Sequence, residues 1–235
     1  MKNKAYVTLF AVFVLFSRTN ITWADQTRTD VVERLQSGTK VLHQILNTPD
    51  KGIPDEVLKG AQCIAVVPGL LKAGFIFAGK HGRGLATCTL PNGSWSAPAF
   101  FAISGGSWGA QIGVESVDLV LMIMNNEGMR HLMEDKFQVG GSIAAAAGPV
   151  GRHAEAGTDW KVESEMLTYS RAKGLFAGID LGGSVVERDQ DATVAFYGKD
   201  LSTRAMLEGK VLMPRDTRPF IAEVRKAKIT AESRH

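Results

Sequence analysis

The feature that most limits the fold of this chain is a middle region in which short β-branched or aromatic runs alternate with glycine. Such runs, bounded by glycine or proline, are typical of strands. Pro91-Asn92-Gly93 is in addition a strong hairpin signal. We expect strands over residues 63–67, 74–78, 84–90, 99–103, 109–114, 117–124, 140–147, 166–172, 175–187 and 193–196.

Helical patterns stand on both sides of this region. Apolar residues of Asp30–Leu46 recur at helical spacing and form one stripe, and Pro54 begins a second short helix that runs to about Ala61. Further helices are expected over residues 126–135, 201–208 and 219–227. Strands and helices do not alternate as βαβ units. We therefore predict an α+β fold: a strongly curved antiparallel sheet or barrel-like core with an N-terminal amphipathic helix and flanking and C-terminal helices.

The first 24 residues have the pattern of a secretory signal peptide. They hold Lys2, Lys4 and Arg18 but no acid, and Ala5–Phe16 is an uncharged run of 12 residues. The alternative is a membrane anchor, but 12 helical residues rise only about 18 Å, less than a bilayer core. We expect cleavage near Ala24 and export to the periplasm, without a lipoprotein anchor because no cysteine lies near that position.

The charge balance changes once the leader is set aside. The remaining residues, 25–235, carry 24 basic and 24 acidic side chains, so counterion release gives no support for a nucleic-acid partner. The chain is 45% hydrophobic and 22% charged, as in globular domains. We expect a single domain with a core over about 31–207 and a basic C-terminal extension over 208–235.

The two cysteines, Cys63 and Cys88, are 25 positions apart in the sequence. In an oxidising compartment they can form a disulfide, and two buried thiols are an equally good interpretation. Neither has an adjacent histidine, and the five histidines are scattered. We expect no metal site and no cofactor.

One segment matches a catalytic motif. Gly105-Gly106-Ser107-Trp108-Gly109 satisfies the G-x-S-x-G pattern of a nucleophile elbow, which makes Ser107 a candidate hydrolase nucleophile. The elbow requires a strand, a sharp turn and then a helix, whereas the residues that follow Gly109 have the pattern of a strand. We expect a protein that is not an enzyme, with a serine hydrolase as the remote alternative.

Eight segments, taken in order, carry a more specific signal than any catalytic motif. They are AVVP from Ala65 with KAGF from Lys72, GRG from Gly82, WSAPAF from Trp95, GGSWGAQIG from Gly105, DLV from Asp118, GPVGR from Gly148, YSRAKGLFAG from Tyr169 and YG from Tyr197. In this order they resemble the SYLF domain family, a lipid-binding domain also known from yeast actin-patch proteins. The resemblance covers about residues 31–207.

The resemblance implies a single non-enzymatic domain that binds anionic lipids. Eukaryotic relatives bind phosphoinositide membranes and some bind actin, but an exported protein meets neither actin nor, normally, phosphoinositides, so actin binding is not expected. Relatives are also thought to contact lipid through a basic first helix. Here acids in that helix offset its bases, which leaves little anionic attraction.

Basic residues beside glycine turns are the candidates for a lipid-headgroup or other anion site. Side chains and bare amides at such turns can meet an anion together. The alternative is that Arg171 or Arg152 pairs with an acid such as Asp118 or Asp180. The six candidates are Lys72, Lys80, Arg83, Arg152, Arg171 and Lys173.

These observations predict an exported domain that binds anionic membrane lipids of the cell envelope. The rival hypothesis is a structural or protein-interaction module of the envelope that uses the Asp30–Leu46 helix or the basic tail.

Overall fold

The computed structural model describes residues 26–46, 52–74, 77–108, 113–149, 164–172 and 175–233. The expected leader, residues 1–24, lies outside them. The helices are α1 (Arg28–Leu46), α2 (Asp55–Gly60), α3 (Asn126–Leu132), α5 (Gln190–Tyr197), α6 (Thr203–Leu207) and α7 (Arg218–Glu232), with a 3-10 turn at Arg215–Thr217. The strands are β1 (Cys63–Gly74), β2 (Phe77–Cys88), β3 (Ala99–Trp108), β4 (Gly113–Ile123), β5 (Lys136–Gln138), β6 (Ala145–Ala147), β7 (Met166–Ala172), β8 (Leu175–Gly178) and β9 (Val185–Arg188).

These strands form one sheet in the order β5-β9-β3-β2-β1-β4-β7-β6, and β8 pairs with β7. All pairs are antiparallel except β6 with β7. The first and last strands of this order, β5 and β6, are joined by residues 139–144 alone. A flat sheet would separate them by about 34 Å, whereas this connection reaches at most about 25 Å. The sheet must therefore curl, which confirms the predicted α+β fold with a strongly curved sheet.

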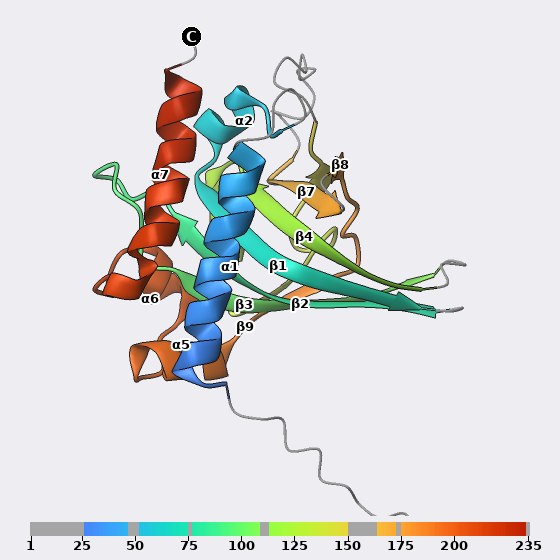
Figure 1. The fold of residues 1–235 in the computed structure, drawn as a ribbon, viewed down its shortest axis with the longest axis horizontal. Helices are drawn as coiled ribbons and strands as arrows, with labels where there is room; N and C mark the ends of the chain where they lie inside the picture. The colour runs from blue at the N-terminus through green and yellow to red at the C-terminus, as the bar shows by residue number, and fades with distance from the viewer. Residues whose placement is uncertain are drawn as a thin grey trace, which may run out of the picture.

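Both faces of the sheet are buried. Along β1, Ile64 and Val66 point to a core shared with α1, α2, α5 and α7, while Cys63, Ala65 and Val67 point to a second core on the other face. Figure 1 shows α1 and α7 side by side across the first face. Successive residues of a strand point to opposite faces of the sheet. Because both faces are covered here, neighbouring residues are both apolar, and the strands contain continuous apolar runs.

The terminal helices pack on each other as well as on the sheet. On α1, Val31, Leu35 and Leu42 are buried. Gly38 lets α1 approach closely, since a β-carbon there would lie 3.0 Å from Leu85 of β2 and 3.7 Å from Phe220 of α7. The basic C-terminal segment thus contributes a buried stripe to the helical layer.

The expected strands 63–67 and 74–78 have the wrong bounds, because residues 74 and 78 belong to two different strands that pair with each other. Residues 63–67 and 74–78 were expected to be separated at Pro68-Gly69, but β1 runs through this dipeptide to Gly74 and β2 begins at Phe77. The pairing with β4 shifts register between Val67 and Leu70, and Gly69 has φ +62°. A bulge absorbs the proline without ending the strand. Strand β4 likewise joins the end of the expected strand 109–114 to the expected strand 117–124, while residues 109–112 lie outside the described residues.

The expectation of a strand at residues 193–196 is wrong. Helix α5 occupies this segment, with the Asp189 side chain capping the amide of Ala192 and Gly198 ending the helix at φ +73°. A four-residue apolar run does not distinguish helix from strand. The expected strands 140–147 and 175–187 are also shortened, to β6 and to β8 with β9. The turn at Pro91-Asn92-Gly93 closes only an isolated bridge between Thr89 and Trp95.

Candidate functional site

Strands β1 to β4 extend beyond the helices (Figure 1). Two lysines occupy paired positions near the free end of β1 and β2. Lys72 of β1 is directly opposite Lys80 of β2, and Glu115 of β4 is opposite Lys72 on its other side. Like charges in directly opposed positions destabilise a sheet. The arrangement therefore concentrates positive charge at a cost in stability. We call Lys72 and Lys80 the lysine pair.

The lysine pair lies on the sheet face turned away from α1 and α7. Lys80 packs over Gly105 of β3, where an added β-carbon would lie 3.1 Å from Lys80 Cε and 3.0 Å from Ser184 Oγ. The Ser184 hydroxyl is buried and has no hydrogen-bond partner among the described residues. Burial lowers the pKa of Lys80, and the charge of Lys72 lowers it further, while Asp180 acts in the opposite direction.

The other face of the same strand end carries two exposed apolar side chains. Leu71 is 51% exposed and Val114 is 78% exposed. Val114 pairs with Ala73, two residues from Leu71, so both side chains point to the same face. The strand end thus carries cations on one face and exposed apolar side chains on the other. Peripheral membrane proteins use both kinds of group, because apolar groups enter the interface while cations meet phosphates.

Two of the remaining candidates, Arg171 and Arg83, are paired with acids away from the lysine pair. Arg171 forms an ion pair with Asp118 at 3.0 Å, which is the alternative that the sequence had left open. Arg83 lies 4.0 Å from Asp189, next to α5. Arg152 and Lys173 lie outside the described residues.

Sequence analysis missed a buried ion pair beneath α1. Arg34 contacts Asp189 at 3.0 Å, and both side chains are less than a tenth exposed. Gln26 donates a hydrogen bond to the same carboxylate at 2.7 Å. Burial lowers the pKa of Arg34, whereas Asp189 acts to raise it. Arg28 in turn pairs with Asp216 and with the carbonyl of Phe196. Two bases of α1, Arg28 and Arg34, thus serve tertiary contacts.

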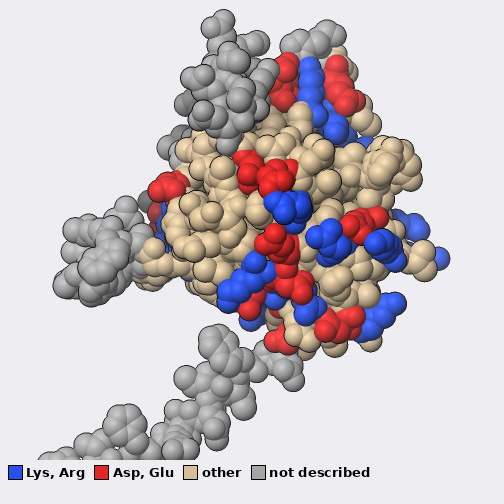
Figure 2. Space-filling view, turned by 180° about the vertical axis from the view of Figure 1, so that it is seen from behind, with Lys and Arg blue, Asp and Glu red and all other residues tan. Residues whose placement is uncertain are grey.

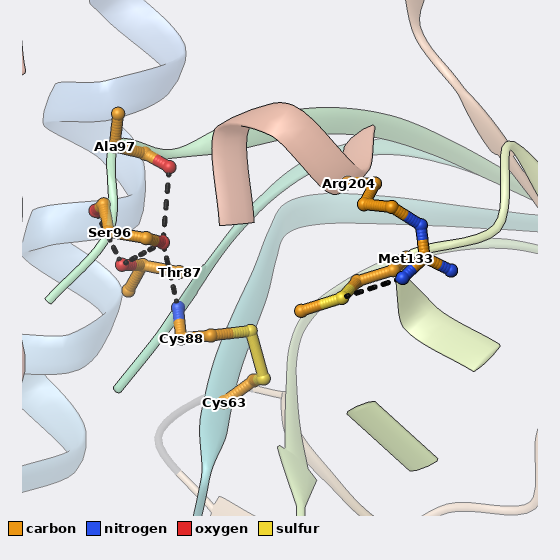
Figure 3. Close-up of a disulfide and its surroundings, with 7 residues drawn as sticks. All are labelled: Cys63, Thr87, Cys88, Ser96, Ala97, Met133 and Arg204. Carbon is orange, nitrogen blue, oxygen red and sulfur yellow. Dashed lines mark hydrogen bonds between the residues drawn. A yellow bond between two sulfur atoms is a disulfide. The ribbon is translucent and has the colours of Figure 1, made fainter. Parts of the chain in front are cut away.

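The structure decides between the two interpretations of the cysteines. Cys63 and Cys88 are directly opposite each other on β1 and β2 and form a disulfide (Figure 3). The Ser96 hydroxyl accepts a hydrogen bond from the Cys88 amide at 3.1 Å. The disulfide is completely buried and ties the first two strands together.

Ser107 does not occupy the setting of a nucleophile elbow. It lies inside β3, paired with Ala78 of β2, and the next described element is the strand β4. A nucleophile elbow needs a turn that leads into a helix. Gly109, the last residue of the motif, lies outside the described residues.

Charges elsewhere on the surface are mixed. Figure 2 shows the face opposite α1 and α7, where basic and acidic side chains are interspersed. Among the described residues, no helix combines the length and apolarity needed to span a bilayer. The same part of the chain holds no cluster of three His, Cys, Asp or Glu side chains arranged for a metal ion.

Fold and site together define a class: an α+β domain whose curled sheet is covered by helices and carries a lysine pair at its projecting end. The family model described as "Ysc84: Las17-binding protein actin regulator" matches residues 104–227. The chain therefore belongs to the Ysc84 family, also called the SYLF domain family, which confirms the resemblance seen in the sequence.

Curated relatives agree with this assignment. The chain is 37% identical to Protein YSC84 of Saccharomyces cerevisiae over 175 residues, which are 73% of this chain and 37% of the relative. It is 34% identical to SH3 domain-containing YSC84-like protein 1 of Xenopus laevis over 174 residues, 73% of this chain and 52% of the relative. The chain thus spans about half or less of the length of these proteins.

Proposed function

We propose that this protein is an exported domain that binds anionic membranes through the free end of strands β1 to β4. The observation that carries the proposal is the lysine pair, Lys72 opposite Lys80, with Leu71 and Val114 exposed on the other face of the same strands. Each basic residue near an anionic surface contributes about 1 kcal/mol. The pair thus supplies about 2 kcal/mol, and the apolar side chains add to it by leaving water.

The proposed location follows from the leader. Its basic start, uncharged run and small residues before Asp25 match a signal peptide, and the disulfide is compatible with an oxidising compartment. The ligand we propose is therefore an anionic phospholipid of the envelope. The family description names Las17 binding and actin regulation. We do not extend these partners to an exported chain.

The test begins with the protein expressed with its own leader. Mass spectrometry of the purified product should show a chain that starts at Asp25, and fractionation should place it outside the cytoplasm. Retention of the leader would contradict the proposed export.

The purified protein is then sedimented with vesicles of phosphatidylcholine alone and of phosphatidylcholine mixed with phosphatidylglycerol, at low and high salt. We expect binding to the anionic vesicles only, weakened by salt because screening reduces the attraction. The double variant Lys72→Gln with Lys80→Gln should bind about thirtyfold more weakly. Lys226→Gln, which removes an exposed lysine of α7, is the matched control and should bind like wild type.

Absence of binding to every vesicle would refute the membrane proposal. Capture of an envelope protein by the same preparation, unchanged in the double variant, would instead favour the rival hypothesis of a protein-interaction module.

A further inference from the structure

A cavity of about 460 Å³ opens at the other end of β2 from the lysine pair. It lies between the segment that follows β2 and the helices α3 and α6, and its lining includes Leu90, Met129 and Met133. This volume is within the range of small-molecule sites, about 300–1,000 Å³. It suits one short acyl chain and is too small for a two-chain phospholipid.

The apolar part of the cavity is matched by a cationic rim. Arg130, Arg204 and Lys210 line the opening, with Glu208 as the one acid in the lining. Arg130 forms an ion pair with Glu127, which does not line the cavity. The rim thus holds more positive than negative charge, beside side chains that favour an apolar ligand.

Contacts within the rim show which anion it accommodates. Arg204 Nη1 lies 3.2 Å from one oxygen of the Glu208 carboxylate, and Lys210 Nζ lies 2.6 Å from the other. Arg204 Nη1 also contacts the sulfur of Met133 at 3.9 Å, as Figure 3 shows. A single nitrogen of Arg204 makes these contacts, so its remaining N–H donors keep the capacity to bind a second carboxylate.

An unsatisfied hydroxyl points to the same conclusion. Thr89 lines the cavity, and its Oγ1 is buried without a hydrogen-bond partner among the described residues. Buried polar groups are rarely left unpaired in native structures. The wall of the cavity therefore holds one polar oxygen without a partner beside its apolar side chains.

We propose that this cavity is a second binding site, which takes a single-chain amphiphile with a carboxylate head, that is, a short or medium-chain fatty acid. The chain lies against Leu90, Met129 and Met133, and the carboxylate lies between Arg204 and Arg130. The site is separate from the lysine pair and does not depend on membrane binding.

The experiment uses protein labelled with ¹³C at the methionine methyl groups, titrated with octanoate below its micelle concentration. We expect the Met129 and Met133 resonances to shift, and that of Met122, which packs on the helix-covered face of the sheet, to stay in place. Decanoate should bind about fifteenfold more tightly than octanoate, because each buried methylene contributes about fourfold. Acetate, which has the head group alone, should leave both resonances unchanged.

Two variants test the rim and the apolar lining separately. Arg204→Gln should weaken octanoate binding about tenfold, and Met129→Trp should also weaken it because the larger side chain narrows the cavity. Lys136→Gln is the control, because it removes an exposed lysine that pairs with Glu187 away from the cavity. Thermal melting verifies that all three are folded.

Unmoved Met129 and Met133 resonances at millimolar octanoate would overturn the proposal. Equal loss of affinity in Arg204→Gln and Lys136→Gln would also overturn it, since it would show nonspecific charge attraction. Octanol binding as tightly as octanoate would refute the carboxylate as the recognised head group.

Discussion

Lys72 and Lys80, eight positions apart in the sequence, are paired directly across the β1–β2 hairpin. Asp180 acts on Lys80, and Glu115 is the cross-strand neighbour of Lys72. These acids offset part of the repulsion within the pair. Function and stability therefore place opposite demands on these two positions.

Lys80→Gln should stabilise the fold while weakening membrane binding. Removing one of two directly opposed cations should raise the free energy of unfolding by about 0.2–1 kcal/mol. The same change should lower affinity for anionic vesicles about fivefold. Urea unfolding and vesicle sedimentation measure the two effects. A variant that is less stable than wild type would show that the attraction of Asp180 outweighs the combined cost of burial and of the repulsion from Lys72.

As the pH rises, membrane binding should weaken at a lower pH than it would if Lys80 were fully exposed. Burial holds the pKa of Lys80 below its usual 10.5, so its charge is lost at a lower pH. Between the folded and unfolded pKa values the unfolded chain binds more protons, so stability should rise with pH in this window. Lys80→Arg keeps its charge and should bind equally well throughout. Vesicle sedimentation between neutral pH and about pH 10.5 compares the two proteins, and identical pH profiles would contradict this account.

Loss of the Cys63–Cys88 disulfide should destabilise the protein by about 2–4 kcal/mol. The bond links residues 25 apart in sequence and removes conformational freedom from the unfolded chain. Urea unfolding of the double variant Cys63→Ala with Cys88→Ala, compared with wild type with and without reductant, measures the effect. An unchanged midpoint would mean that the sheet alone holds these strands together.

Arg34→Gln should lower the free energy of unfolding by about 3–5 kcal/mol, because it leaves the buried Asp189 carboxylate without its closest cation. Arg28→Gln is the matched control on the same helix. Its ion pair with Asp216 is about half exposed, so the loss should stay below about 1 kcal/mol. Chemical unfolding of both variants tests the difference, and similar losses would show that Arg83 replaces Arg34 beside Asp189.

Two glycines of β2 should respond differently to substitution by alanine. A β-carbon at Gly84 would lie 2.5 Å from Phe101 Cζ and 2.7 Å from the carbonyl oxygen of Val66, whereas at Gly79 it would meet nothing within 4 Å. Gly84→Ala should therefore lower the free energy of unfolding by about 1–3 kcal/mol. Gly79→Ala should leave it unchanged or raise it slightly. Thermal and urea unfolding compare the two. Equal effects would mean that the space between β1 and β3 adjusts to a methyl group.

Local patterns were sufficient to predict the helices at both ends and the fold class. The apolar stripes of α1 and α7 recur at helical spacing, and that spacing depends only on neighbouring residues. The order of the glycine-rich segments was likewise sufficient to predict the family. Residues 193–196 were assigned wrongly because a short apolar run fits helix and strand alike, and the Asp189 cap became evident only in the structure.

The amino-acid sequence by itself determined the helical ends, the strand-rich middle and the family. Tertiary structure alone decided that β1 passes through Pro68-Gly69, that Lys72 meets Lys80, that Arg171 pairs with Asp118, and that a cavity lies beside Thr89. The physical reason is that register and sheet closure arise from pairing between distant segments. Which charges come together therefore depends on contacts that no local pattern contains.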